Sequence, residues 1–235
     1  MAAEPVSRFD FIVGLHDLSE APDARGDELD SWLPFSEARP LLDRIRATCD
    51  STGVPFQVTS DDAFRSDYEI LMPWLLERQV PGTFFIPTRF IGLPGRLTEA
   101  HIQDMAGLGM RFGVHGAQHI NWLTAGMTAF RADAREGKDR LEQTLGRAVD
   151  VVAVPFGGFN GPIVAELRAL GFRAIHTSRS GLALRDVAIK PRNMLKRSQI
   201  EQVVAASGRR GNLRDGLHCR LRQLRASVEA VAMRA

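Results

Sequence analysis

The sequence predicts an α/β fold, a distorted (β/α) barrel of about seven parallel strands in a single domain. Short apolar segments alternate with amphipathic segments roughly every 30 residues along the 235-residue chain, which is typical of parallel β/α units. About six or seven such units favour a closed or nearly closed barrel over an open sheet. The glycine-rich fingerprint of dinucleotide-binding open sheets is also absent after the first apolar segment.

Short apolar runs bounded by turn residues predict the strands. The first run, residues 9–15, ends directly before His16 and Asp17. Further strands are expected at residues 55–60, 82–87, 111–115, 149–154, 172–177 and 187–190. Proline, glycine and several acids in residues 18–33 predict a long loop after the first strand.

Amphipathic segments between these strands predict helices. Leu41, Leu42 and Ile45 lie on one side of the segment 35–52, in agreement with the 3.6-residue period of a helix. Other helices are expected at residues 66–79, 98–107, 125–145 and 162–170, the last of which ends at Gly171.

The composition is that of an ordinary globular protein. Hydrophobic residues make up 44% of the chain and charged residues 25%, which excludes a disordered or fibrous protein. No apolar run approaches the roughly 18 residues of a membrane span, and residues 1–5 lack the basic start of a secretory signal. The two cysteines, Cys49 and Cys219, do not suggest a disulfide framework. We therefore expect a cytoplasmic protein without a membrane span.

Positive charge is concentrated near the C-terminus. The net charge is only +2, yet residues 209–235 contain seven arginines against two acids, Asp215 and Glu229. This segment is predicted to be an arginine-rich helix or tail that follows a main domain of residues 1–208. Such a segment could contact nucleic acid or anionic lipid. Because no aromatic residues are interleaved with the arginines, we favour a solvated helix face and expect no nucleic-acid partner.

Polar residues suited to chemistry follow several of the predicted strands. They are His16 and Asp17, Asp61 and Asp62, His115, the turn 155–158 and His176. In a β/α barrel the functional site lies where the strands end and the loops begin. The sequence therefore predicts a group of carboxylates and imidazoles on one rim of the barrel.

Two of these features together predict a metal site. Asp61 and Asp62 are adjacent at a strand end, where neighbouring side chains point in opposite directions, so one can bind a metal while the other acts as a base. His115 and His119 are four residues apart, and a helical turn after the strand would bring both imidazoles to one side. Two histidines and one carboxylate, with a position open for water, describe a hydrolytic metal site.

The same segments resemble a known family. Residues 58–63, Val-Thr-Ser-Asp-Asp-Ala, resemble the Thr-Phe-Asp-Asp-Gly signature of polysaccharide deacetylases with the nodulation protein B homology domain, also called carbohydrate esterase family 4. Residues 81–86 are similar to its Ala-Thr-Phe-Phe strand, residues 114–119 to its His-Ser/Thr-x-x-His motif, and residues 154–160 to its Pro-Tyr-Gly turn. The resemblance extends over roughly residues 9–195 and implies a deacetylase domain within residues 1–208.

This resemblance implies a role for each residue of the predicted site. Asp61 would be the general base that takes a proton from the metal-activated water. Asp62, His115 and His119 would bind the divalent metal, which is most often zinc in this family. The metal and the backbone N–H of Phe156 would stabilise the oxyanion that forms as water attacks the acetamide carbonyl.

The general acid requires a separate assignment. The family usually supplies a histidine from a Leu-x-His motif near the C-terminus, and no residue after Arg192 fits that motif. Residues 14–17, Gly-Leu-His-Asp, instead resemble the subgroup of biofilm poly-N-acetylglucosamine deacetylases, in which this motif is permuted to the N-terminus. The first and last strands of a barrel are neighbours, so we predict His16 as the acid. His176, at another strand end, is the competing candidate.

Three departures from the family pattern concern this site. Ser60 replaces the usual phenylalanine and Ala63 the usual glycine, which costs about 1 kcal/mol if the turn needs a positive φ. The arginine that often begins the third motif and orients the base is missing, since residues 151–154 are Val-Val-Ala-Val. Arg192 could replace it, although a plain surface arginine is an equally good interpretation. Because the base, the three ligands and one acid candidate are all present, we expect an active enzyme.

The leading hypothesis is a metal-dependent hydrolase that removes N-acetyl groups from an N-acetylglucosamine-containing saccharide. The acetylated saccharide would be a chitooligosaccharide or an exopolysaccharide precursor. One alternative is a non-catalytic relative of the same fold that only binds saccharide. Another is a protein that binds nucleic acid or a membrane surface through the arginines of residues 209–235.

Overall fold

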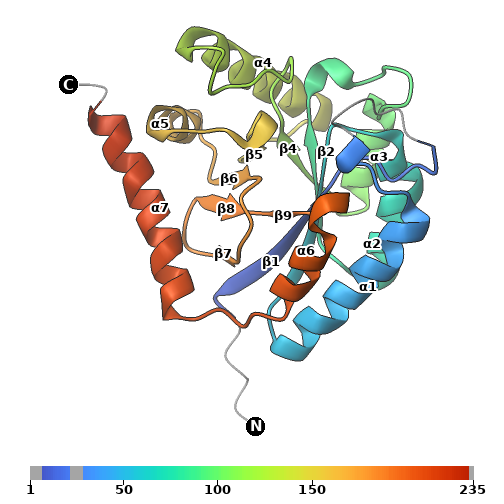
Figure 1. Cartoon of the computed structure of the whole chain (residues 1–235). Coiled ribbons are helices and arrows are strands. Elements are labelled where there is room, and N and C mark those ends of the chain that lie inside the picture. Colours follow the sequence, from blue (N-terminus) through green and yellow to red (C-terminus); the bar gives the residue numbers. More distant parts are fainter. Residues whose placement is uncertain (1–6, 22–28, 233–235) are drawn as a thin grey trace.

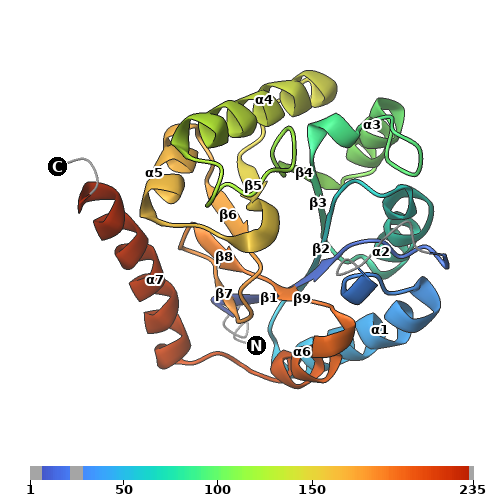
Figure 2. The same cartoon turned by 45° about the horizontal axis from the view of Figure 1, so that its top comes forward.

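Mostly parallel strands curl into a nearly closed barrel with helices packed around it (Figures 1 and 2). The computed structural model describes residues 7–21 and 29–232, with side chains up to residue 226. The strand order is β7-β1-β2-β3-β4-β5-β6-β8, and β9 also pairs with β1. The predicted distorted (β/α) barrel is confirmed.

The strands follow the predicted order with small shifts of their bounds. They are β1 (Phe9–Leu15), β2 (Phe56–Asp61), β3 (Gly82–Ile86), β4 (Arg111–Val114), β5 (Val151–Ala153), β6 (Ala174–Thr177), β7 (Ala183–Leu184), β8 (Ile189–Pro191) and β9 (Asn193–Met194). Every residue of β1 and β3 is buried, as expected for parallel strands that are covered on both faces. The two-residue strands β7 and β9 are too short for a periodic signal and lie outside the predicted set.

The helices follow from apolar residues spaced three and four apart. They are α1 (Phe35–Thr52), α2 (Met72–Arg78), α3 (Glu99–Gly107), α4 (Met127–Leu145), α5 (Gly161–Ala169), α6 (Ile200–Ser207) and α7 (Leu213–Ala232). Helix α1, for example, buries Ala38, Leu42, Ile45 and Cys49, and it ends at Gly53, whose φ of 70° is left-handed. The helix predicted at residues 66–79 is present, but its first part, Asp67–Leu71, is π-helical and only Met72–Arg78 (α2) is α-helical.

The barrel closes at one residue between two short strands. Strand β8 pairs in parallel with β6, at one end of the sheet, and β9 pairs in parallel with β1, at the other. Only Arg192 separates β8 from β9, so the chain crosses from one end of the sheet to the other at this residue. Arg192 is fully buried, and its interpretation as a plain surface arginine is therefore wrong.

The C-terminal segment forms helix α7, which packs along α5 on the outside of the barrel (Figures 1 and 2). Cys219 and Ala226 of α7 are buried in this contact region. The arginine-rich segment is thus a helix within the described residues, while the domain division at residue 208 stays a prediction. No helix in residues 7–21 and 29–232 combines the length and the apolar character needed to cross a membrane.

Candidate metal centre

The site begins with a strained turn at the end of β2. Asp61 is the last residue of the strand, and Asp62 and Ala63 then adopt left-handed backbone conformations with φ of 74° and 56°. The turn is held by the Asp62 N–H, which donates to the Phe85 carbonyl at 3.2 Å, and by Arg96, which donates to the Asp62 carbonyl at 3.0 Å. Each left-handed residue other than glycine costs about 1–2 kcal/mol. The energetic cost expected at Ala63 is therefore incurred. The turn places Asp61 beside Arg192 and Asp62 beside His119.

Asp62, His115 and His119 bring three potential ligand atoms together. Oδ1 of Asp62 lies 3.3 Å from Nε2 of His119 and 3.7 Å from Nε2 of His115. One ligand atom from each of the three side chains falls within 4.8 Å of the other two. A carboxylate oxygen and two imidazole nitrogens are a donor set of catalytic zinc sites, so these residues fit a divalent metal.

His115 is oriented for binding through Nε2. Its Nδ1–H donates to the Ala153 carbonyl at 2.9 Å, which leaves the lone pair on Nε2, facing Asp61 and Asp62. Burial lowers the pKa of His115 to about 3, so the imidazole is neutral at physiological pH. A hydrogen bond from the second ring nitrogen is the usual way in which proteins orient a metal-binding histidine.

A loop, and not the expected helical turn, brings the two histidines together. Residues 115–126 contain no helix, and Gly116 and His119 have φ of 77° and 54°. A Cβ atom on Gly116 would lie 2.3 Å from Oδ2 of Asp133, so a glycine is needed there. The imidazoles therefore converge as the spacing suggested, but through a loop in place of a helical turn.

Asp133 organises this loop, and sequence analysis missed it. Its Oδ1 accepts hydrogen bonds from the backbone N–H groups of Ala117 at 3.1 Å and Gln118 at 2.6 Å. Its Oδ2 accepts one from the indole N–H of Trp122 at 2.7 Å. Asp133 is buried on the otherwise apolar face of α4. A carboxylate at a core position of an amphipathic helix is the signal that could have identified it.

Asp61 is bound by Arg192 through two hydrogen bonds. The two guanidinium NH groups lie 2.6 and 2.9 Å from the two carboxylate oxygens, and both side chains are buried. Burial by itself raises the pKa of Asp61, but the positive charge of Arg192 outweighs it and holds that pKa below the usual range. Asp61 is therefore an anion at neutral pH, with Oδ2 3.8 Å from Nε2 of His115. Arg192 thus occupies the position expected for an arginine that orients the base.

A cleft of about 480 Å³ opens above these residues at the carboxyl ends of the strands. Aromatic side chains form much of its wall: Trp32, Phe64, Phe90 and Phe156. His16, at the end of β1, lines the same cleft, together with Asp61 and the three potential ligands.

His176 lies elsewhere, within the barrel. Its ring packs against Phe85 at a centroid distance of 4.9 Å, and it does not line the cleft. Burial, followed by the charge of Arg192, lowers its pKa well below the usual value, so His176 is neutral. Of the two acid candidates, His16 is the one beside the potential metal ligands.

Phe156 lies at the edge of the cleft in the turn Pro155–Gly157 that follows β5. Its backbone is left-handed, with φ of 57°, and its ring stacks on His119 at 4.8 Å. Sparsely populated backbone conformations of this kind are common where a main-chain group must face a ligand.

The fold and this cluster define a class of protein: a β/α barrel with a carboxylate–imidazole centre at the carboxyl ends of its strands. The model of the polysaccharide deacetylase family matches residues 54–175, which is more than half of the chain. The chain belongs to the polysaccharide deacetylase family. The matched residues include the three potential ligands and Asp61, while His16 and Arg192 lie outside them.

Individual relatives are distant in sequence. A Bacillus subtilis (strain 168) protein named "Putative polysaccharide deacetylase YxkH" is 24% identical over 131 residues, which are 55% of this chain and 46% of that protein. The match thus spans about half the length of this relative. The structure of IcaB from Ammonifex degensii has a TM-score of 0.72 at 21% identity and covers 86% of this chain and 97% of its own. The structure of the Streptococcus pyogenes deacetylase PplD in complex with acetate has a TM-score of 0.71 at 17% identity. The match covers 86% of this chain and 99% of PplD. These similarities show the fold, and the resemblance to the biofilm subgroup stays a prediction.

The contact between α4 and the histidine loop generates a first prediction. A Cβ atom on Gly137 of α4 would lie 2.7 Å from the backbone carbonyl carbon of Gly116, which cannot move cheaply. We expect Gly137→Ala to lower the free energy of unfolding by about 1–3 kcal/mol and to weaken zinc binding, because the loop that carries the histidines must shift. Urea unfolding and zinc titration would measure both effects. Gly107→Ala is the matched control in α3, since nothing lies within 4 Å of its Cβ position. Equal behaviour of the two variants would contradict the prediction.

The buried ion pair generates a second prediction. Lysine keeps the charge of Arg192 but cannot donate to both oxygens of Asp61. We expect Arg192→Lys to lower the free energy of unfolding by about 1–3 kcal/mol, measured with urea, because buried hydrogen-bonding groups lose their partners. Arg185→Lys is the control, since the Arg185–Asp10 pair is partly exposed and its loss should cost at most about 1 kcal/mol. A smaller effect at Arg192 than at Arg185 would show that the buried pair does not stabilise the fold.

Proposed function

We propose that the protein removes N-acetyl groups from an N-acetylglucosamine-containing oligosaccharide or polysaccharide, such as a chitooligosaccharide or an exopolysaccharide precursor. One observation carries the proposal: an anionic Asp61, paired with Arg192, lies in the same cleft as the cluster of Asp62, His115 and His119 and next to it. A base and a separate metal-binding group are the two components that amide hydrolysis by water requires.

Asp62, His115 and His119 would hold the metal, for which we propose Zn²⁺. When bound, the metal supplies Lewis acidity that polarises the acetamide carbonyl and lowers the pKa of the attacking water. The neutral state of His115 and the hydrogen bond from its Nδ1–H to Ala153 support this assignment, because a protonated imidazole cannot bind a metal.

Asp61 is proposed to accept the proton of the attacking water. Its bidentate pair with Arg192 fixes the carboxylate in one orientation and keeps it ionised. A base held rigidly before the reaction has no entropy to lose in the transition state. Arg192 is therefore a positioning residue for the base.

His16 is proposed to give a proton to the leaving amine, since an amine anion is a very poor leaving group. Its place in the cleft supports this role, whereas His176 is buried outside the cleft. The backbone N–H of Phe156 is proposed to donate to the oxyanion of the tetrahedral intermediate, from the left-handed turn at the cleft edge.

The aromatic wall supports a saccharide as substrate. Trp32, Phe64 and Phe90 line the cleft, and aromatic faces are surfaces on which the apolar C–H face of a pyranose ring can pack. The alternative, a relative that binds saccharide without catalysis, has no specific support, because base, potential ligands and acid candidate all lie in one cleft.

Two kinds of variant distinguish the proposed metal ligands from the proposed base. We expect Asp62→Ala and His119→Ala to lose bound zinc and acetate release together, because each removes one ligand atom. Asp61→Asn should keep its zinc but lose acetate release by about a hundredfold or more, since an amide cannot accept the proton.

Zinc content by mass spectrometry and acetate release from N-acetylglucosamine oligomers, with the protein stripped of metal and then reloaded, would measure both. If Asp61→Asn also lost its zinc, Asp61 would be a ligand and not a separate base. If the zinc-loaded wild type released no acetate from any oligomer, the proposed substrate class would be wrong.

Two substrates whose leaving groups differ in their need for a proton test the assignment of His16 as the general acid. We expect His16→Ala to slow acetate release from N-acetylglucosamine oligomers by about a hundredfold or more. Its effect on 4-nitrophenyl acetate should be far smaller, because the nitrophenolate leaves without being protonated. His176→Asn serves as the control and should leave the ratio of the two rates unchanged. Equal losses on both substrates would remove His16 from the acid role.

A further inference from the structure

Helix α7 presents a leucine stripe on its surface. Leu213, Leu217, Leu221 and Leu224 are spaced three or four residues apart, so they share one face of the helix. They are 93%, 56%, 50% and 59% exposed. Single exposed leucines need no explanation, but four in a row on one helix face mark a surface that binds an apolar partner.

This face lies opposite the buried side of α7, and its edges border the barrel. The positions of α7 that pack against the rest of the protein are occupied by Cys219 and Ala226, which are buried. Figures 1 and 2 show α7 beside α5 with its outer side uncovered by any other helix. The leucine stripe is therefore not part of the core of this chain.

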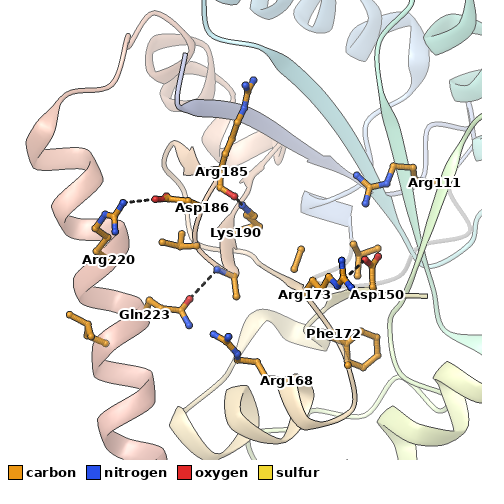
Figure 3. Close-up of a pocket in the computed structure, with 16 residues that line it drawn as sticks. Arg111, Asp150, Arg168, Phe172, Arg173, Arg185, Asp186, Lys190, Arg220 and Gln223 are labelled. Carbon is orange, nitrogen blue, oxygen red and sulfur yellow. Dashed lines mark hydrogen bonds and ion pairs between the residues drawn. The ribbon is translucent and has the colours of Figure 1, made fainter. Parts of the chain in front are cut away.

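A basic pocket adjoins the leucine stripe. It has a volume of about 920 Å³, and Arg220 and Leu224 of α7 form part of its wall. Figure 3 shows Arg220 across the pocket from side chains of the barrel. Its other basic side chains come from the barrel and α5: Arg111, Arg168, Arg173, Arg185 and Lys190. Since Leu224 belongs to both, the pocket and the stripe form one continuous surface.

The positive charge of the pocket is only partly neutralised. Asp186 pairs with Arg220, and Asp150 lies 3.9 Å from Arg173. Within the described part of the chain, the exposed side chains of Arg111 and Arg168 make no ion pair. The pocket therefore has unneutralised guanidinium groups, which are suited to phosphate.

We propose that α7 and the basic pocket bind the protein peripherally to an anionic lipid surface. The leucines would enter the interface between headgroups and acyl chains, and the arginines of the pocket would bind headgroup phosphates. A stripe of apolar residues on a cationic helix is the arrangement that lies in the plane of such a surface. Each basic residue near an anionic leaflet adds further attraction.

Charge argues against other occupants of this surface. Residues 213–232 contain four arginines and two acids, so two copies of α7 packed through their leucines would bring like charges together. Nucleic acid would satisfy the arginines but would leave the leucines in water. An anionic bilayer interacts favourably with both groups.

The proposed surface lies away from the cleft. Arg111 is the first residue of β4, and Asp150 and Arg173 directly precede β5 and β6, so the pocket is at the amino ends of these strands. The cleft is at the carboxyl ends. Attachment through α7 would therefore leave the cleft open to substrate, and the proposal does not depend on the proposed deacetylase activity.

Vesicle sedimentation of the full chain tests the proposal. We expect the wild type to sediment with vesicles of phosphatidylcholine and phosphatidylglycerol and not with phosphatidylcholine alone. Replacing Leu217, Leu221 and Leu224 together by serine should lower the partition coefficient about tenfold or more. The control is Leu108→Ser directly after α3, where the leucine is similarly exposed at 48%.

The charge component is tested in the same assay. Arg111→Glu combined with Arg168→Glu should also lower partition about tenfold or more, while Arg135→Glu on α4 should change it little. Circular dichroism confirms that each variant is folded. Unchanged sedimentation of the leucine variant would overturn the proposal. It would also be overturned if light scattering showed that the wild type is a dimer, that the leucine variant is a monomer, and that the two bind vesicles equally. The proposal would likewise be overturned if the wild type bound duplex DNA but no vesicles, and the arginine variant lost the DNA binding.

Discussion

The buried pair between Arg192 and Asp61 links the closure of the barrel to the placement of the Asp61 carboxylate in the cleft. Arg192 is the residue at which the chain leaves β8 and enters β9, and so crosses between the two ends of the sheet. Its guanidinium group reaches across the interior to the end of β2. Because a buried charge without a partner costs about 3–5 kcal/mol, neither residue is stable there alone. The correct closure of the barrel therefore also positions the carboxylate.

The three potential metal ligands depend on loops, and these loops depend on regular elements beneath them. The turn at Asp62 and the loop from Gly116 to His119 both contain left-handed residues that cost energy in isolation. The first is held by β3 and Arg96, and the second by three hydrogen bonds to the buried carboxylate of Asp133. Contacts with β3 and α4 thus compensate the strain. The ligand atoms therefore converge although the segments that carry them are neither helix nor strand.

Most of the fold could be predicted from sequence because its elements are periodic. The strands from β1 to β6 and helices such as α1 and α4 each carry a local apolar pattern, and local order along the chain then indicates parallel pairing. What could not be predicted depends on residues far apart in sequence. Arg192 is 131 positions from Asp61, and nothing local distinguishes it from a surface arginine. The loop between His115 and His119 likewise follows from Asp133, a residue of the next helix.

The arginine that is absent before the third motif can be explained by charge balance in the barrel interior. The buried carboxylate of Asp61 is paired with the buried guanidinium group of Arg192, which lies 5.2 Å from the ring centroid of Phe85. A second arginine at the end of β5 would add a buried cation without a partner, which is strongly unfavourable. The apolar residues 151–154 are therefore compatible with a guanidinium group on the segment that closes the barrel. In the same interior, burial and then the positive charge of Arg192 lower the pKa of His176 well below its usual value, so that imidazole is neutral. The guanidinium group that binds Asp61 is thus supplied by the segment that closes the barrel, and not by β5.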